Sequence, residues 1–237
     1  MASVYVLTLR QLTGRWRLLI MTALSALPVL MAVVVLTSDN APSVQEFETV
    51  VFSAMLAGSI APLVVLAIGG AAFANEVEDR TIANLTLSPL PRWQIVVPKL
   101  MAVITLAAPF IAVSAALTSH VAFLGDVRAT VAVTVAALVG VVLYAATFVY
   151  LGLVTTQAIF IGLLYVVIWE GFFSGFVAGV RLLSIRHYAI AWMHGLDARR
   201  FAAGDHLSLT ASIIVTAVVF TVLVALSVRR LRRMDIP

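Results

Sequence analysis

The sequence predicts an all-α polytopic membrane protein that forms a single domain over residues 1–237. Of its residues, 62% are hydrophobic and only 11% are charged, and its mean hydropathy is +1.11. Soluble domains contain about 25% charged residues. The apolar residues form continuous runs and do not alternate with polar residues as in an outer-membrane barrel. Because the hydrocarbon layer offers no water to the backbone, such runs must be helices.

Six of these runs are long enough to cross a bilayer, whose core of about 30 Å needs about 20 helical residues. The expected spans are 18–37, 50–74, 100–123, 129–153, 157–178 and 208–228. The outer end of the fifth span is the least sharply bounded. A long outer loop over residues 179–207 precedes the sixth.

The distribution of lysine and arginine predicts that both termini are cytoplasmic. With the N-terminus inside, ten of the 15 basic residues lie on the inner side. The first outer loop contains Asp39, Glu46 and Glu48 but no basic residue. We therefore expect a multi-pass protein of the plasma or inner membrane. The basic residues are divided between the two sides, so the high pI does not indicate a nucleic-acid partner.

Residues 1–17 predict a helix that lies in the inner membrane interface. Tyr5, Leu9, Leu12 and Trp16 fall on one helical stripe, and the arginines lie off it, as in interfacial helices. Such a helix serves either as a simple anchor or as a contact for a cytoplasmic partner.

The cytoplasmic segment 75–99 combines three acidic and three basic residues between two apolar runs. Acidic residues near its start favour the positive end of a helix dipole, and Ile82 and Leu85 are spaced to share a helical face. Pro89 disfavours helical backbone at Ser88, so the helix should end there. The pattern predicts a short helix parallel to the membrane. The alternative is an ordinary solvated loop.

This segment resembles the pattern of ABC-2 type transporter permeases. The residues that carry the resemblance are Glu76, Asp79-Arg80-Thr81-Ile82, Leu85, Ser88-Pro89, Arg92 and Lys99. Arg80 stands where the family pattern usually has glycine. The six spans, the amphipathic N-terminal helix and the long final outer loop are also similar to that family, so the resemblance covers nearly the whole chain.

The resemblance implies the membrane-spanning permease subunit of an ATP-binding cassette exporter. Its partners would be a separate ATPase subunit, which binds ATP and Mg²⁺, and a second permease subunit in a homodimer or a related heterodimer. We expect the contact with the ATPase to be formed by Glu76, Asp79, Arg80, Ile82 and Leu85. The chain contains no G-x-x-x-x-G-K-[ST] loop, and its only lysine is Lys99. We therefore expect no ATPase activity from this chain alone, and no cofactor of its own.

The fifth span contains Glu170, the one acidic residue of an apolar run. An intramembrane carboxylate is costly and is a candidate functional group. At 1.5 Å per residue it lies about 20 Å along the span, toward the outer leaflet. We assign Glu170 and Phe173 to the translocation path or the outer gate. Alternatively, Glu170 caps a re-entrant helix or pairs with Arg181 or Arg186.

The glycines of this region form a ridge that lets helices approach closely. Gly171, Gly175 and Gly179 are spaced four residues apart, and they serve either packing within one subunit or a subunit interface. Family members often fold this outer portion into short re-entrant helices, and residues 174–195 could do the same.

Two other classes of function are weighed against the permease. The first is a secondary transporter or channel with Glu170 as its ionisable group, although the sequence shows no inverted repeat. The second is an intramembrane enzyme, for which Glu170 with His187 or His194 is the only arguable catalytic set. The irregular spacing of the histidines shows no metal motif, so we assign neither catalytic nor metal-binding residues.

Overall fold

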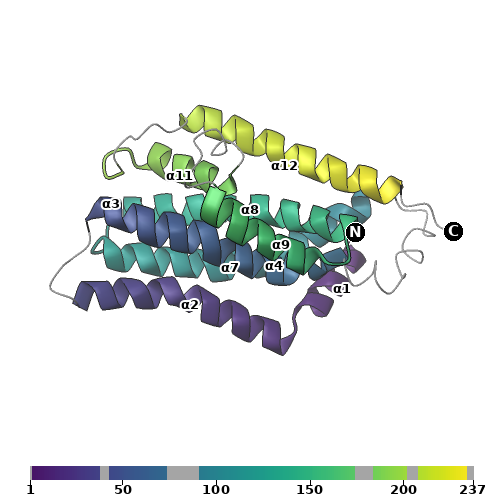
Figure 1. Ribbon diagram of the computed structural model, residues 1–237, viewed down its shortest axis with the longest axis horizontal. Coiled ribbons are helices and arrows are strands. Elements are labelled where there is room, and N and C mark those ends of the chain that lie inside the picture. The colour runs from purple at the N-terminus through teal and green to yellow at the C-terminus, as the bar shows by residue number, and fades with distance from the viewer. Residues whose placement is uncertain (1, 38–42, 74–90, 174–183, 202–207, 234–237) are drawn as a thin grey trace.

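The computed structural model describes residues 2–37, 43–73, 91–173, 184–201 and 208–233, and every regular element in these ranges is a helix. Figure 1 shows an elongated bundle in which the long helices run roughly along one axis. The helices long and apolar enough to cross a membrane are Arg15–Val35, Val44–Phe73, Trp93–Ala122, Val127–Val154 and Leu209–Arg232. The predicted all-α membrane fold is confirmed at this level.

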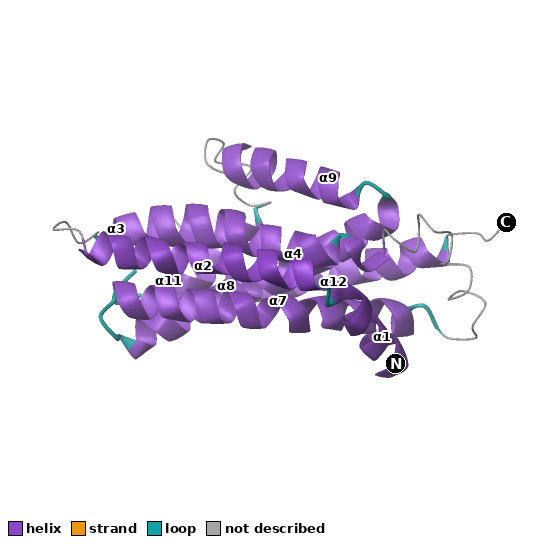
Figure 2. Cartoon of the chain, turned by 90° about the horizontal axis from the view of Figure 1, so that it is seen from below, coloured by secondary structure: helices purple, strands orange, loops and turns teal. Residues whose placement is uncertain are grey.

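The helices follow one another along the chain with short connections. In order they are α1 (Ala2–Leu12), α2 (Arg15–Thr37), α3 (Val44–Glu46), η1 (Phe47–Ile60), α4 (Ala61–Gly69), α7 (Trp93–Ala122), α8 (Val127–Val154), α9 (Ala158–Leu164), η2 (Tyr165–Phe173), α11 (Ile185–Leu196) and α12 (Leu209–Arg232). The two elements named η1 and η2 are π-helices, in which an N–H group bonds the carbonyl five residues earlier. Figure 2 shows the same elements from below, with α9 at one edge of the bundle.

The fifth expected span, 157–178, is described only up to residue 173. It comprises α9 and η2, and its apolar stretch Ala158–Gly171 is shorter than the other candidate spans. The six-span layout and the re-entrant helices before α12 therefore stay predictions.

The core of the bundle is formed by Val44–Phe73 and α8. In the most apolar windows of these helices, 67% and 61% of the residues are buried, against 22% in α2 and 11% in α12. Small side chains on α8 allow this close packing, and the buried ones include Ala129, Ala132, Ala136 and Gly140. Figure 1 accordingly shows α2 and α12 along opposite edges of the bundle.

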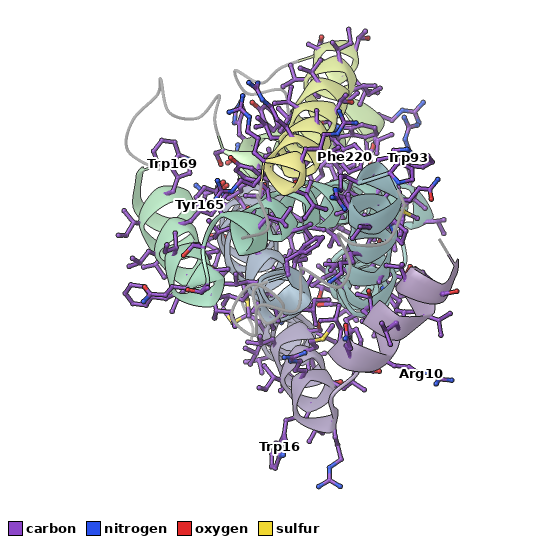
Figure 3. The ribbon with its side chains drawn as sticks, turned by 90° about the vertical axis from the view of Figure 1, so that its right-hand side faces the viewer. Arg10, Trp16, Trp93, Tyr165, Trp169 and Phe220 are labelled. Atoms are coloured by element: carbon purple, nitrogen blue, oxygen red, sulfur yellow. The ribbon has the colours of Figure 1, made fainter. Side chains whose placement is uncertain are left out.

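The N-terminal helix ends earlier than expected. It stops at Leu12, and the non-helical Thr13 and Gly14 separate it from α2, consistent with the low helix propensity of glycine. Trp16 therefore belongs to the first turn of α2; it is 73% exposed and points away from the bundle (Figure 3), whereas Leu12 is buried. The Tyr5 hydroxyl donates a 3.1 Å hydrogen bond to Thr105 Oγ1, which ties α1 to α7.

The two ends of the bundle differ in composition. We call the end where α7 begins the Lys99 end, and the end where α7 gives way to α8 the Phe123 end. Short helix α11 packs against α8, η1 and α12, and its last turn lies near the start of α8, because Arg128 Nη2 donates to the Leu196 carbonyl at 3.4 Å.

Candidate functional site

The predicted site residues are described unevenly. The structure describes Glu170 and Gly171 and the backbone of Phe173, the last residue of η2. The predicted coupling residues Glu76, Asp79, Arg80, Ile82 and Leu85 lie outside the described residues, as do Gly175, Gly179 and Arg181.

The carboxyl group of Glu170 is fully buried and links η2 to the start of α11. Its Oε1 atom accepts hydrogen bonds from the Tyr165 hydroxyl at 3.0 Å and from the Ile185 backbone N–H at 2.9 Å. Its Oε2 atom accepts one from the Ser184 hydroxyl at 2.6 Å. Hydrogen bonds to a carboxylate are stronger than those between neutral groups, so this set compensates much of the cost of burial.

Glu170 occupies the N-terminus of α11, a position that favours negative charge. Ser184 is the N-cap residue, with the extended backbone typical of that position (φ −93°, ψ 125°), but its side chain makes no cap hydrogen bond to α11. The carboxyl group of Glu170 instead takes an N–H group that the helix leaves unpaired, and the helix dipole adds to the attraction. This geometry is the capping arrangement that the sequence left open for Glu170.

The tyrosine Tyr144 of α8 lies beside this site and is itself fully buried. Its hydroxyl lies within electrostatic range of both Glu170 and Arg186, and it donates to the Ala57 carbonyl at 3.1 Å. That carbonyl is available because residue 62 is proline. Ala61 N–H bonds the Leu56 carbonyl in the π-helical pattern, and the next bond of the pattern would need an N–H on Pro62, which proline lacks.

Arg186 reaches from α11 onto the surface of η1 at Gly58. A Cβ atom at Gly58 would lie 3.0 Å from Arg186 Cδ, 3.3 Å from Arg186 Nη1 and 2.8 Å from the Ser53 carbonyl oxygen. Only glycine fits there without a shift of its neighbours. The site thus joins four elements, η2, α11, α8 and η1, and Tyr165 lies on the side of η2 that faces the bundle (Figure 3).

The glycine of the predicted ridge that is described, Gly171, is exposed, and a Cβ there would meet nothing closer than the Val166 carbonyl at 3.5 Å. Close packing of this segment occurs instead at Gly162. A Cβ at Gly162 would overlap the side chain of Leu66, so α9 lies directly on α4 there. The face of Gly171 therefore remains open to lipid or to another subunit.

Lys99 forms a clamp at the other end of the bundle. Its side chain is almost fully buried between α7 and the end of the second span. The Nζ atom donates to the Ala72 carbonyl at 2.6 Å and lies 4.3 Å from the ring centroid of Phe73, in the range of a cation–π contact. The two residues that flank segment 74–90 are therefore held close together.

The Phe123 end holds a cluster that the sequence did not predict. Glu48 Oε1 on η1 lies 2.5 Å from His194 Nε2 on α11, with both side chains largely buried. Arg128 Nε lies 3.5 Å from Asp197 Oδ1. The same end also contains the Arg200–Asp126 ion pair at 3.1 Å and ring contacts among Phe47, Phe123 and Phe201.

Of the site residues that sequence reasoning missed, only Ser184 carries a local signal. A serine before the apolar run that starts at Ile185 is a typical N-cap. Tyr144 and Gly58 carry none, because each looks like an ordinary residue of an apolar helix, and their roles depend on partners far away in the chain.

The arrangement around Glu170 positions helices. Among the described residues, its partners are a tyrosine, a serine and a backbone N–H, which hold a carboxyl group in place. Within the same ranges, no group of three or more His, Cys, Asp or Glu side chains is placed to hold a metal ion. In comparisons with known proteins, no family model matches the chain, and no curated protein matches it in sequence.

Proposed function

We propose that this protein is the permease subunit of an ATP-binding cassette exporter, driven by a separate ATPase subunit. Two copies, or one copy and a related permease, form the membrane channel. The Lys99 end faces the cytoplasm with both termini, and segment 75–99 is the coupling element. The chain binds no nucleotide itself; ATP and Mg²⁺ belong to the partner.

The observation that carries this proposal is the Lys99 clamp. A coupling element has to transmit force from a moving ATPase into the membrane helices, which requires that its two ends be fixed to those helices. Ala72 and Phe73, just before the segment, are joined to Lys99, just after it. Because Lys99 is also the lysine of the family-like motif, the same residue supports the proposal in sequence and in space.

Glu170 fits the proposal as a positioning residue of the outer gate. It couples η2 to α11, so a movement of η2 is transmitted to α11 and, through the contact of Glu48 with His194, to η1. The exposed apolar face of α9 and η2 supports a subunit interface there; its exposed residues include Ile159, Phe160, Val167 and Ile168. In this proposal, Glu170→Gln impairs export while the complex still assembles.

The test uses variants of the coupling segment that leave the spans unchanged. The chain is expressed with its genomic neighbours, purified by an affinity tag, and the co-purified ATPase activity is measured. Ile82→Asp with Leu85→Asp should remove the ATPase or uncouple it. The matched control is Asn84→Asp, which adds a charge to the same segment off the proposed contact face.

The outcomes separate the proposal from its alternatives. ATPase activity of the isolated chain would overturn it, as would a purified, transport-competent protein without any ATPase partner. The second result would instead indicate a secondary transporter or channel. Equal effects of the paired aspartates and of Asn84→Asp would overturn the assigned contact residues.

A further inference from the structure

A groove of about 420 Å³ lies between α2 and α7, at an edge of the bundle. It is lined by Thr22, Ser25, Ala26, Val29 and Leu30 of α2 and by Pro109, Phe110, Val113, Ser114 and Leu117 of α7. Its volume falls in the range of roughly 300–1,000 Å³ typical of small-molecule sites. It shares no residue with the site around Glu170.

Two hydroxyl groups in the groove wall lack the partners that buried hydroxyls normally have. Ser25 and Ser114 are 7% and 1% exposed, and neither hydroxyl has a hydrogen-bond partner among the described residues. By contrast, Thr22 Oγ1 donates to the Leu18 carbonyl at 2.8 Å. An unpaired buried hydroxyl is unfavourable, and rotation about χ1 between staggered positions can direct it toward the groove.

The depth of the groove restricts what can satisfy these hydroxyls. Ser25 follows Arg15 by ten residues, or about 15 Å of helix, which is half of a hydrocarbon core of about 30 Å. Phospholipid ester groups lie in the interface and do not reach that depth. A molecule that offers a hydrogen bond there must be dissolved in the hydrocarbon layer itself.

The length of the groove excludes a spanning helix as its natural occupant. On each helix the lining extends over eight residue steps, about 12 Å at 1.5 Å per residue. A neighbouring transmembrane helix would instead be met along most of the roughly 30 Å core. The shape thus favours a compact molecule.

We propose that this groove binds a lipid-soluble molecule with one hydrogen-bond acceptor, of the class of ketones and quinones. Its apolar body contacts Val29, Phe110 and Val113, and its carbonyl oxygen accepts hydrogen bonds from Ser25 and Ser114. The site needs no ATPase partner, so it stands or falls independently of the proposed transport function.

The probe is benzophenone, which combines a compact apolar body with one carbonyl group and forms covalent bonds to nearby C–H groups under ultraviolet light. The full chain in lipid nanodiscs is labelled, and the labelled residues are identified by mass spectrometry. We expect the label on Val29, Phe110 and Val113. Diphenylmethane, which has the same rings and no carbonyl, should compete about tenfold less well than unlabelled benzophenone.

Two sets of variants test the contacts. Ser25→Ala with Ser114→Ala should weaken benzophenone binding about tenfold, the loss expected for two modest hydrogen bonds, and should raise the unfolding temperature of the free protein. Val113→Trp should block labelling. Its control is Val131→Trp, since Val131 on α8 is similarly exposed outside the groove.

Three results would overturn the proposal. The first is labelling spread over all exposed helices, with diphenylmethane competing as well as benzophenone. The second is unchanged binding in the serine double variant. The third uses the absence of cysteine from the chain: efficient disulfide formation between two copies of Val113→Cys would show that a second subunit covers the groove.

Discussion

The Tyr144 hydroxyl of α8 donates a 3.1 Å hydrogen bond to the Ala57 carbonyl of η1, 87 residues away in the sequence. The bond exists because Pro62 cannot supply the N–H that would continue the π-helical pattern to Ala57. A helix irregularity in the core is thereby satisfied by a side chain from a neighbouring helix, and it lies next to the buried carboxyl group of Glu170.

Tyr144→Phe should destabilise the protein by about 1–3 kcal/mol, because it leaves the buried Ala57 carbonyl without a partner. The measurement is thermal unfolding in detergent, followed by tryptophan fluorescence. Tyr150→Phe is the matched control, since Tyr150 is only partly buried on the same helix. Equal stability of the two variants would contradict the role given to the Tyr144 hydroxyl.

Glu170 and Ser184 should show strong energetic coupling. Glu170→Gln and Ser184→Ala each weaken the 2.6 Å hydrogen bond between them, so their effects on unfolding free energy should be non-additive, with a coupling of about 1–3 kcal/mol. Ser184→Ala tests this contact cleanly because the serine side chain does not itself cap α11.

The control cycle pairs Glu170→Gln with Ser212→Ala on α12, whose hydroxyl bonds the Ser208 carbonyl within its own helix. That pair should be additive within about 0.5 kcal/mol. If both cycles are additive, the link from η2 to α11 contributes nothing measurable.

Gly58→Ala should destabilise the protein by about 1–3 kcal/mol, the usual cost of overpacking. The added methyl group would clash with the Ser53 carbonyl and with the side chain of Arg186. Gly14→Ala is the control, because a Cβ there would meet nothing closer than 3.9 Å. A second substitution, Arg186→Ala, should recover only part of the loss, since the Ser53 carbonyl stays in place; full recovery would show that the backbone contact is unimportant.

Lys99→Met should reduce the ATPase activity that co-purifies with the chain, while the protein still inserts in the membrane. Methionine keeps much of the apolar stem and loses the hydrogen bond to Ala72, so the two ends of segment 74–90 are no longer held together. Gln94→Met, five residues earlier on α7, is the control. Unchanged co-purification and activity in Lys99→Met would remove the main support for the coupling role of this segment.

The sequence predicted the helices well where the signal was long and local. The expected spans 18–37, 100–123, 129–153 and 208–228 each overlap a continuous helix of the structure. Expectations that rested on a few residues fared less evenly. Trp16 was placed on the stripe of the N-terminal helix, but Gly14 interrupts that helix, so Trp16 belongs to α2.

Glu170 illustrates how far sequence reasoning reaches into the site. Its position in an apolar run identified it as a group that must face protein, a water-filled space or a basic partner, and the structure places it against protein. The partners themselves could not be named, except that Arg186 was one of two candidates for pairing. Ser184 lies 14 residues further along the chain, and which turn of α11 meets η2 depends on the path between them.

Composition and the length of the apolar runs alone determined that this is a helical membrane protein, because the transfer of each run into hydrocarbon depends on its own residues and not on its neighbours. Tertiary structure decided which helices form the core, how the buried groups of Glu170, Tyr144 and Lys99 are satisfied, and where a groove with unpaired hydroxyls remains. These features depend on contacts between residues far apart in the chain, and between apolar helices in lipid such contacts are selected by close packing and hydrogen bonds rather than by hydrophobicity.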